Sequence, residues 1–268
     1  MNRKARMAYV NGIGLWSPRL PGWEASRPIL LGNVPGPDSD AARPAPALLP
    51  PNERRRAPDT VALSMEVASQ ACNQAGINPA TLPCVFTSTH GDLAVTDYMC
   101  STLASNPTLV SPTRFHNSVH NAAAGYWTIA TGCGVPYTAL SAHEFSFAQG
   151  LLEALLQLDA SSDVLLVAYD IEAKGLIAAV ASSKGMLGAA LVLSKQQSAN
   201  TRAALRWEIS EAGAASATAA SPRNSALVAG NAMQACLPMM EALAGLIDTV
   251  TIPLGASLAL HIHVRAAF

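Results

Sequence analysis

His143 and Glu144 stand where a short apolar segment is expected to pass directly into a helix. Residues 137–141 have the apolar run of a buried strand, and residues 144–158 repeat apolar side chains at helical spacing. A side chain at the start of a helix meets the positive end of the helix dipole and unpaired backbone N–H groups. An imidazole beside a carboxylate at such a place is a candidate for general acid–base chemistry. A histidine that fills a pocket or makes a structural hydrogen bond is the simpler interpretation.

Glu144 also fits a local structural role. Residues 141–144 read Ser-Ala-His-Glu, which is the S-x-x-E pattern of a capping box. In that arrangement the Ser141 hydroxyl caps the helix, and the Glu144 carboxylate reaches back to the backbone N–H of Ser141. We expect capping rather than a role in a pocket, although the pattern leaves both open.

Another pair of histidines has the spacing of metal ligands. His116 and His120 are four residues apart, but the residues between them lack the glutamate of the H-E-x-x-H zinc pattern. Asn117 and Ser118 resemble a helix N-cap, which would leave His116 in the loop before a helix over 118–131. We therefore expect no metal site.

A third candidate set follows an expected buried strand. His90, Gly91 and Asp92 open the next expected helix, and Ser88 or Ser118 could complete a Ser-His-Asp arrangement with them. A hydrolase of that kind would be expected to carry a G-x-S-x-G elbow, which the sequence lacks. Gly91 suits a tight turn and Asp92 suits a first helical turn, so we favour a structural role.

The composition limits the classes of function. Half of the 268 residues are hydrophobic and only 13% are charged, against about 25% in an average soluble domain. This low charge fraction favours burial of some surface in a permanent partner interface, with a large alanine-rich core as the alternative. The net charge of −1 gives no nucleic-acid footprint. The five cysteines lack C-x-x-C spacing, which argues against a disulfide framework and a zinc site, so we expect buried free thiols. We also expect no cofactor.

The sequence also predicts where in the cell the protein is found. No apolar run reaches the ~20 residues that a transmembrane helix needs. The basic N-terminus leads into a segment that is too short and too polar for a secretory signal. We therefore expect a cytoplasmic protein without a membrane span.

Alternating strands and helices predict an α/β fold. Because the strands are continuously apolar, we expect a parallel or mixed sheet that is covered on both faces. Residues 18–58 contain ten of the 18 prolines and predict a long irregular loop, and the Ala/Ser-rich residues 212–223 predict a flexible one. The expected strands cover 8–15, 83–89, 137–141, 164–169, 186–193, 202–209, 248–253 and 256–265, and the expected helices cover 59–75, 92–105, 118–131, 144–158 and 229–245.

Several segments together resemble the ketosynthase-like, N-terminal-half family of thiolase-fold proteins. The resemblance extends over residues 8–195 and is weaker beyond. Some members of this family resemble the chain-length-factor-like subunits of bacterial aryl polyene and xanthomonadin pigment clusters. The segments that carry the resemblance are Leu49 to Arg56, Cys84 to Leu93, Ser111 to Gly125 and Leu140 to Leu152.

The resemblance implies a fold and a domain organisation. The fold would be α/β and thiolase-like, a layered αβα arrangement with a truncated second half. Residues 1–268 would form a single ketosynthase-like domain, in which residues 1–195 make the first half, including the loop 18–58. Residues 196–268 would make the reduced second half.

The resemblance gives the strand-to-helix junction a second meaning. In ketosynthases this junction carries the nucleophilic cysteine, and this chain has His143 there. Acyl transfer in that family needs a thiolate, and an imidazole cannot hold a stable thioester. Two histidines of the second half activate malonyl decarboxylation in the family. The C-terminal histidines here, His261 and His263, are spaced to share the solvated face of an edge strand instead.

The resemblance also implies which residues face a tunnel or a partner. Phe145 and Phe147 point about 200° apart on a helix, so at most one of them can face an acyl tunnel. Residues 118–121 are a fold signature near the family's dimer interface, and the helix that contains them is apolar on more than one face. The tunnel or pocket candidates are His143, Glu144, Phe145 and Phe147, and the interface candidates are Ser118, Val119, His120, Asn121, Ala123, Tyr126 and Trp127.

The expected function is that of a non-catalytic chain-length factor. Such a subunit would form a heterodimer with a catalytic beta-ketoacyl-ACP synthase and shape its acyl tunnel in polyene, polyketide or fatty-acid-type biosynthesis. The acyl carrier protein would be a transient partner. One alternative is a stand-alone acyl-thioester decarboxylase or thioesterase that uses His143 and Glu144. A second alternative is a homodimeric module that binds acyl chains.

Overall fold

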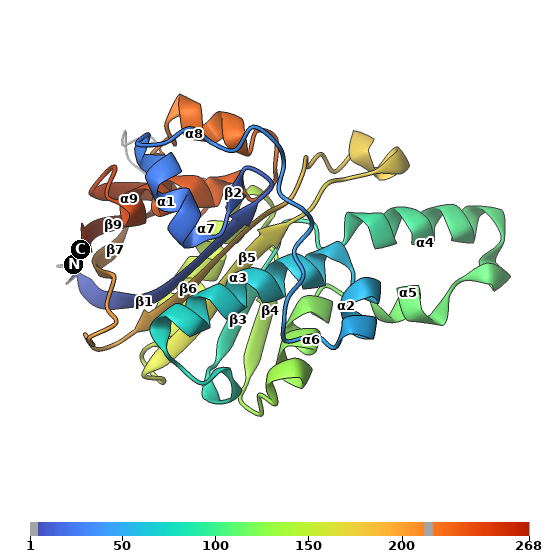
Figure 1. Ribbon diagram of the computed structural model, residues 1–268, viewed down its shortest axis with the longest axis horizontal. Helices are drawn as coiled ribbons and strands as arrows, with labels where there is room; N and C mark the ends of the chain where they lie inside the picture. Colours follow the sequence, from blue (N-terminus) through green and yellow to red (C-terminus); the bar gives the residue numbers. More distant parts are fainter. Residues whose placement is uncertain (1–4, 212–216, 268) are drawn as a thin grey trace.

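The computed structural model describes residues 5–211 and 217–267. Their strands form one nine-stranded mixed sheet in the order β4-β3-β5-β6-β1-β7-β9-β8, with β2 paired to β1 (Figure 1). Only the pairs that β3 makes with β4 and β5 are parallel. The predicted mixed sheet is confirmed. The strands are β1 (Arg6–Ser17), β2 (Leu20–Pro21), β3 (Cys84–Thr87), β4 (Tyr137–Leu140), β5 (Asp163–Asp170), β6 (Leu187–Ser194), β7 (Ala203–Glu211), β8 (Thr249–Pro253) and β9 (Leu258–Ala266).

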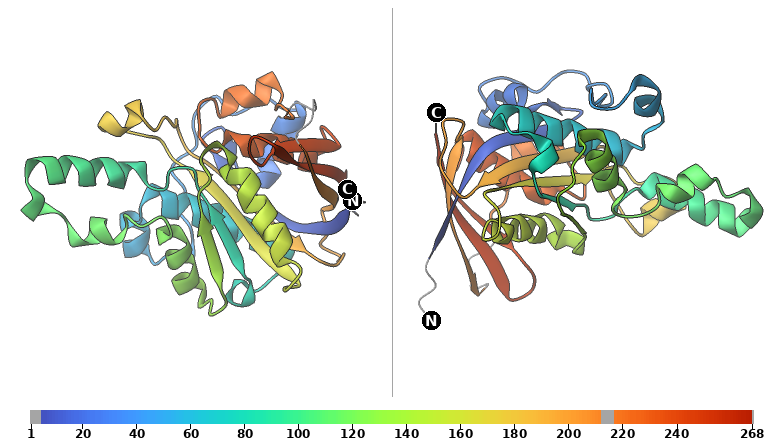
Figure 2. Two further views of the ribbon diagram at one scale, coloured as in Figure 1. Left: turned by 180° about the vertical axis from the view of Figure 1, so that it is seen from behind. Right: turned by 90° about the horizontal axis from the view of Figure 1, so that it is seen from below.

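Helices cover both faces of the sheet. Helices α3 and α7 lie on opposite sides of the sheet (Figure 2). Helix α6 shares the core of α3, and α9 and the buried residues of α1 share the core of α7. The α-helices are α1 (Trp23–Leu31), α2 (Pro51–Arg56), α3 (Asp59–Ala75), α4 (Leu93–Ser105), α5 (Pro112–His116), α6 (Ala122–Thr131), α7 (Ser146–Gln157), α8 (Pro222–Leu227) and α9 (Leu237–Ala244). Short 3₁₀ turns are η1 (Pro79–Thr81), η2 (Pro107–Leu109), η3 (His143–Phe145), η4 (Gly175–Ala179) and η5 (Gln234–Cys236).

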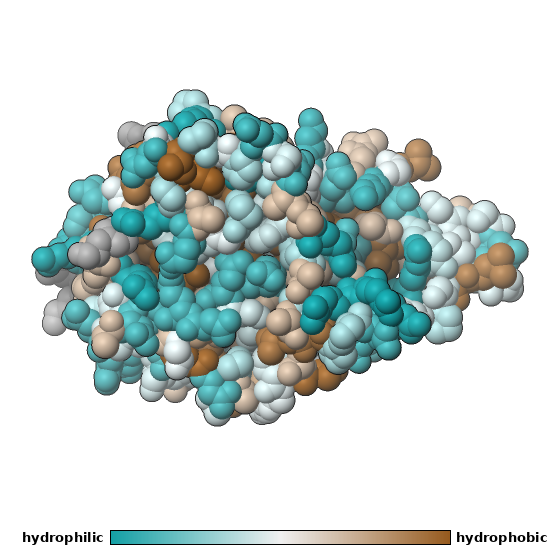
Figure 3. All heavy atoms as spheres, viewed as in Figure 1, coloured by the Kyte–Doolittle hydropathy of each residue, from teal (hydrophilic) through white to brown (hydrophobic). Residues whose placement is uncertain are grey.

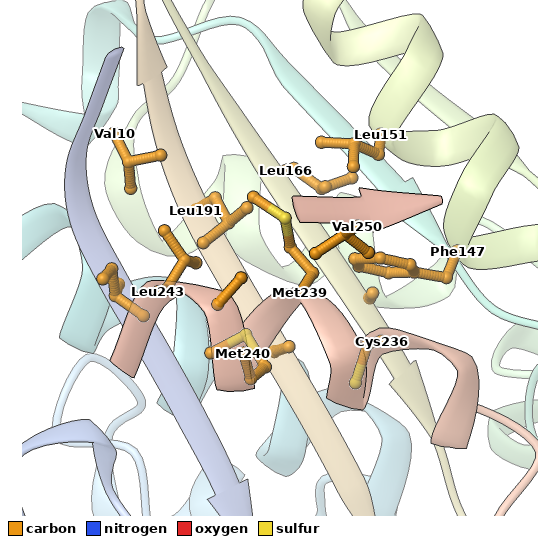
Figure 4. Close-up of a cluster of buried hydrophobic side chains, with 14 of the residues drawn as sticks. Val10, Phe147, Leu151, Leu166, Leu191, Cys236, Met239, Met240, Leu243 and Val250 are labelled. Carbon is orange, nitrogen blue, oxygen red and sulfur yellow. The ribbon is translucent and has the colours of Figure 1, made fainter. Parts of the chain in front are cut away.

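The central strands are buried on both sides because their side chains alternate between two cores. In β5, Leu166 packs with α7 and α9, whereas Leu165 and Val167 pack with α3 and α6. Figure 4 shows the first core, in which Leu166 lies beside Met239 of α9 and Leu151 of α7. This explains why the strands read as continuous apolar runs in the sequence.

Helix α3 packs on β1 with backbone against backbone. A Cβ atom on Gly12 would overlap the carbonyl oxygen of Ala71, and one on Gly14 would overlap that of Val67. Glycine is therefore required at two positions of β1 for the helix to lie this close to the sheet. The C-terminus of α3 is closed by Gly76 in the left-handed conformation, as its sequence signal predicts.

Parts of the sequence-based prediction were wrong. The proline-rich segment 18–58 contains β2, α1 and α2. Pro51 is the first residue of α2, where proline is tolerated, and buried Trp23 and Leu30 anchor α1 although Pro28 lies inside that helix. The helix expected over 118–131 begins only at Ala122. The helix expected over 229–245 is reduced to α9 and a preceding 3₁₀ turn.

Of the loop expected over 212–223, residues 212–216 lie outside the described residues, and Pro222 already begins α8. Asp59 is the first residue of α3, whose N-cap is Pro58, and the Asp59 carboxylate forms an ion pair with Arg43 at 2.5 Å. Every other expected strand and helix is present, with ends that differ by a few residues.

The close packing of α3 on β1 can be tested with a pair of glycine substitutions. Gly14→Ala should lower the free energy of unfolding by about 1–3 kcal/mol, because the new methyl group overlaps a backbone oxygen. Gly125→Ala is the matched control: its Cβ meets nothing within 4 Å, and it lies inside a helix. Urea denaturation should show Gly125→Ala to be stabilising by about 0.5–1 kcal/mol. Equal stability of the two variants would contradict this packing.

Candidate functional site

The junction between β4 and α7 has a strained backbone. His143 has a φ of 53° and is the only residue other than glycine with a positive φ in the described part of the chain. Left-handed backbone costs an L-residue about 1–2 kcal/mol. Non-glycine residues held in this region cluster at functional sites. The chain thus keeps a sharp strand-to-helix turn here, with an imidazole at its tip.

Ser146 organises this turn, and the predicted capping box is wrong. The Ser146 hydroxyl accepts a hydrogen bond from the backbone N–H of Ala142 at 3.0 Å and donates one to the carbonyl oxygen of His143 at 2.6 Å. The Ser141 hydroxyl instead donates to the carbonyl oxygen of Thr89 at 3.0 Å. Sequence spacing could not reveal this, because the partner of Ser141 lies on a distant loop. Glu144 is exposed.

The four tunnel candidates occupy different environments. His143 and Glu144 are exposed, and Phe145 is half-buried. Phe147 lies deep in the core against α9, as Figure 4 shows. The prediction that the two phenylalanines face different surroundings is confirmed. Because Phe147 fills this core, it is excluded from a tunnel wall, and the role of Phe145 stays a prediction.

A buried carboxylate beside the junction was missed by the sequence analysis. The Asp170 side chain, at the end of β5, accepts hydrogen bonds from the Ser88 hydroxyl at 2.8 Å and from the backbone N–H groups of Thr89 and His90 at 3.0 and 3.1 Å. Burial raises the pKa of the Asp170 carboxyl above its ordinary value, and the bonds from Thr89 and Ser88 oppose that rise. The hydroxyl of Ser88 in turn accepts the N–H of Gly91.

The remaining histidine candidates have structural contacts. His120 donates from Nε2 to the carbonyl oxygen of Ser88 at 3.1 Å and so satisfies a backbone group. The side-chain amide of Asn121 donates to the Tyr137 hydroxyl at 2.9 Å. His116 is the last residue of α5 and not part of a loop. Within residues 5–211 and 217–267, no group of three or more His, Cys, Asp or Glu side chains could hold a metal ion.

Asp92 and the cysteines can be placed in the same way. Asp92 caps α4 by accepting the N–H of Val95 at 2.8 Å, which confirms its structural role. Burial raises the pKa of Asp92 above its ordinary value. Cys72, Cys84 and Cys236 are buried, as predicted. The expectation was wrong for the other two cysteines, because Cys133 is half-buried and Cys100 is exposed on α4.

The two C-terminal histidines lie far along the sheet from the junction. His261 and His263 are on β9, where their rings contact Thr251 and Thr249 of β8. They share one face, as predicted. However, β9 pairs with β7 and β8 on its two sides, so it is not an edge strand. The register places Glu208 of β7 opposite His261, and both groups belong to a polar outer face of the sheet.

Helix α6 has one buried face and one exposed face. Ala123 and Trp127 pack against α3 and the sheet, whereas Ile129 is 84% exposed and Val119, in the preceding turn, is 54% exposed. The proposal that Ala123 and Trp127 contact a partner is therefore corrected, because both are covered by this chain's own core. Ser118, Val119 and Asn121 are exposed, and His120 and Tyr126 are half-buried.

The exposed face of α6 borders a hollow. This α2–α6 hollow has a volume of about 730 Å³ and is bounded by Leu48, the turn at Val119, and Tyr126 and Ile129 of α6, with Glu53 and Arg56 of α2 at its side. In Figure 3 hydrophobic residues gather over α6, next to the hydrophilic surface of α2. An apolar hollow of this size is a feature of ligand or partner binding.

More apolar side chains are exposed on the arm formed by α4 and α5, which projects from the body of the molecule (Figure 1). The exposed apolar side chains on η4, on β4 and near α6 are added to them to define a set, which we call the exposed apolar surface. Monomeric proteins seldom leave so many large apolar side chains in water within one stretch of chain. The exposed apolar surface consists of Leu103, Leu109, Phe115, Val119, Ile129, Tyr137, Leu176 and Val180.

The family of the chain can now be stated. The family model described as "Beta-ketoacyl synthase, N-terminal domain" matches residues 32–245, which is well over half of the 268 residues. The chain therefore belongs to the beta-ketoacyl synthase N-terminal domain family. A comparison with curated protein sequences found no match.

Solved structures agree with this family at the level of fold. This chain is similar to a chain in the structure of the ketosynthase ApeO in complex with its chain length factor ApeC from Xenorhabdus doucetiae. The two chains are 21% identical with a TM-score of 0.72, and the match covers 96% of this chain and 99% of that chain. It is also similar to a chain in the structure of a type II PKS acyl-carrier protein in complex with its ketosynthase bound to the hexaketide (AntDE:AntF). Here the identity is 13% and the TM-score 0.69, and the match covers 97% of this chain and 99% of that chain. A beta-ketoacyl synthase from Burkholderia phymatum STM815 matches at 13% identity and a TM-score of 0.59, over 91% of this chain but only 71% of that chain.

These similarities confirm an α/β, thiolase-like fold that is truncated relative to a larger ketosynthase. In the part of the chain that the structure describes, no helix is both long enough and apolar enough to cross a membrane.

The strained turn at His143 can be tested by glycine substitution. His143→Gly should be more stable than His143→Ala by about 1 kcal/mol, because glycine adopts a positive φ without the steric cost that alanine has. At Glu144, the next residue of η3, the φ angle is not positive, so Glu144→Gly should be less stable than Glu144→Ala. Thermal and urea denaturation of the four variants measure both differences. The same order at the two positions would contradict the strain.

Proposed function

We propose that this protein is a non-catalytic ketosynthase-like subunit, a chain-length factor that pairs with a catalytic beta-ketoacyl synthase. The observation that carries the proposal is His143 at the tip of the strained turn between β4 and α7. Covalent acyl transfer needs a nucleophile that can form and release a thioester, and an imidazole at this position does not supply one. The similarity to the complex of ApeO with its chain length factor ApeC supports the same interpretation.

The surface of the chain supports a permanent partner. The exposed apolar surface and the low charge fraction are typical of a face that becomes buried in an obligate complex. Strand β4 adds to this argument, because among the described strands it pairs only with β3 and ends the sheet. A strand at the edge of a sheet can pair with a strand of another chain. Carrier protein would dock transiently on the assembled complex.

Product class and domain division belong to this proposal. An aryl polyene or related polyketide is the product class we favour, since the quoted sequence segments resemble subunits of such pathways. We also propose that residues 1–195 act as the first half of a single domain and residues 196–268 as a reduced second half. The sheet joins both parts through the pairing of β1 with β6 and β7.

A stand-alone decarboxylase or thioesterase is less well supported. Among the described residues no hydrogen bond joins Glu144 to His143, and both side chains are exposed rather than enclosed in a pocket. Exposed acid–base groups gain little from the low dielectric that makes catalytic groups effective. A homodimeric module that binds acyl chains is kept as an outcome of the test below.

Co-expression with a neighbouring ketosynthase, followed by size-exclusion chromatography and native mass spectrometry, tests the proposed assembly. We expect poor solubility or self-association of this chain alone and a well-behaved 1:1 heterodimer with the ketosynthase, because the apolar surface is then covered. A monodisperse monomer that ignores the ketosynthase would refute the proposal. A stable homodimer that binds acyl chains without a ketosynthase would favour the binding module.

Residues of the exposed face of α6 should control pairing. Ile129→Asp should weaken the heterodimer by tenfold or more, about 1.4 kcal/mol, because it places a charge in an apolar interface. It should leave the stability of the isolated subunit nearly unchanged, since the side chain is already in water. Leu156→Asp, at an exposed leucine on α7, is the control and should leave pairing intact. Titration by biolayer interferometry gives both affinities; equal effects would mean that α6 is not in the interface.

Substitutions of the two phenylalanines after the junction should have different effects, one on product length and the other on stability. Phe147→Ala should cost about 3–5 kcal/mol of unfolding free energy, because the side chain fills the core. Phe145→Ala should cost far less, and it should allow longer products if Phe145 closes the tunnel of the complex. Mass spectrometry of products from the reconstituted heterodimer makes the comparison. Unchanged product length with Phe145→Ala would remove this residue from the tunnel.

A further inference from the structure

We infer that Asp170 is the positioning residue of the exposed apolar surface; its bearing on partner binding rests on the proposed function. Apart from α6, which packs into the core through Ala123 and Trp127, the elements that present this surface have almost no hydrophobic core of their own. Helix α4 buries only Leu93 and Val95, and α5, η4 and β4 have no buried residue. Something other than apolar packing must therefore fix their orientation on the body.

The Asp170 carboxylate fixes the loop that leads into the arm. Its Oδ1 atom accepts the Ser88 hydroxyl and the N–H of His90, and its Oδ2 atom accepts the N–H of Thr89. The Ser88 hydroxyl also accepts the N–H of Gly91, whose φ is positive. The Asp170 carboxylate thus accepts donors of residues 88, 89 and 90, and the Ser88 hydroxyl accepts the N–H of Gly91. Hydrogen bonds to a carboxylate are stronger than those between neutral groups.

The loop 88–91 then holds three of the elements that carry the exposed apolar surface. The carbonyl oxygen of Ser88 accepts His120, which lies in the turn between α5 and α6. The carbonyl oxygen of Thr89 accepts Ser141, at the end of β4. The loop continues into Asp92, which caps the first turn of α4. One loop therefore contacts the arm, the turn before α6 and the end of β4, and Asp170 holds that loop in place.

The backbone of Asp170 is also connected, through the side chain of Asn231, to the segment that follows η4. The backbone carbonyl oxygen of Asp170 accepts Asn231 at 3.3 Å, and the same amide group of Asn231 donates to the carbonyl oxygen of Lys184 at 2.9 Å. Gly175, at the start of η4, lies against Asp97 of α4, whose carboxylate accepts the N–H of Leu176. Loss of the Asp170 side-chain acceptors should loosen the loop 88–91 and the elements bound to it, while the backbone contact with Asn231 and the two cores stay intact.

Asp170→Asn removes the charge and turns one acceptor into a donor. The matched control is Glu241→Gln in α9. Glu241 is also buried and accepts the N–H and hydroxyl of Ser221 and the side chain of Asn224, but on the other side of the molecule. Both variants lose a buried hydrogen-bonded carboxylate. A difference in their effects therefore comes from where the carboxylate lies in the fold and not from a general loss of stability.

Hydrogen exchange of the chain alone tests the anchor without any partner. We expect Asp170→Asn to speed exchange of the amides of residues 88–91 by tenfold or more, about 1.4 kcal/mol, and Glu241→Gln to leave them unchanged. Equal exchange in both variants would overturn the inference. If Asp170→Asn does not fold, Ser88→Ala replaces it, since this milder change removes one donor and the acceptor for Gly91.

Affinity for the ketosynthase tests the link to the partner. Asp170→Asn should weaken heterodimer formation by about tenfold. The affinity of Glu241→Gln should stay close to that of the wild type, even if its melting temperature falls as much as that of Asp170→Asn. Faster exchange at residues 88–91 combined with unchanged affinity would overturn the positioning role. If the wild-type chain itself fails to bind a ketosynthase, the proposed function fails, and the exchange measurement still decides whether Asp170 is the anchor.

Discussion

The structure depends on the direct contact between the backbone of α3 and β1. Gly12 and Gly14 let the helix lie close enough for its carbonyl groups to touch the strand. Helix α3 is buried on nearly all sides, and α6 packs beside it in the same core. The depth of α3 therefore sets the position of α6, and with it the place of the α2–α6 hollow. A small change in this spacing would be transmitted through a close-packed layer.

The fold and the chemistry of the junction rest on different residues. The layers need glycines and apolar side chains, whereas acyl transfer needs a single nucleophile at the turn after β4. In the proposed function His143 takes the place of that nucleophile, and its exposed side chain lies outside both cores. A chain with the fold of a ketosynthase need not carry out its reaction, which is why function has to be argued from the site and the surface.

Much of the fold could be predicted from the sequence because the buried strands are continuous apolar runs. The start of α6 could not be predicted, since Asn117 and Ser118 look like a cap but are used elsewhere. Ser118 donates to the carbonyl oxygen of Phe115, and Asn117 accepts the Tyr126 hydroxyl. Asp170 was missed for a related reason: its partners lie about 80 residues earlier, and a single buried carboxylate has no local signature.

The central claim is that this chain contributes a surface and a tunnel wall, but no nucleophile, to a ketosynthase complex. The most direct measurement is the intact mass of each subunit after the reconstituted complex has been incubated with acyl-loaded carrier protein. The account predicts an acyl adduct on the ketosynthase partner and none on this chain. A stable acyl adduct on this chain, at His143 or elsewhere, would contradict it.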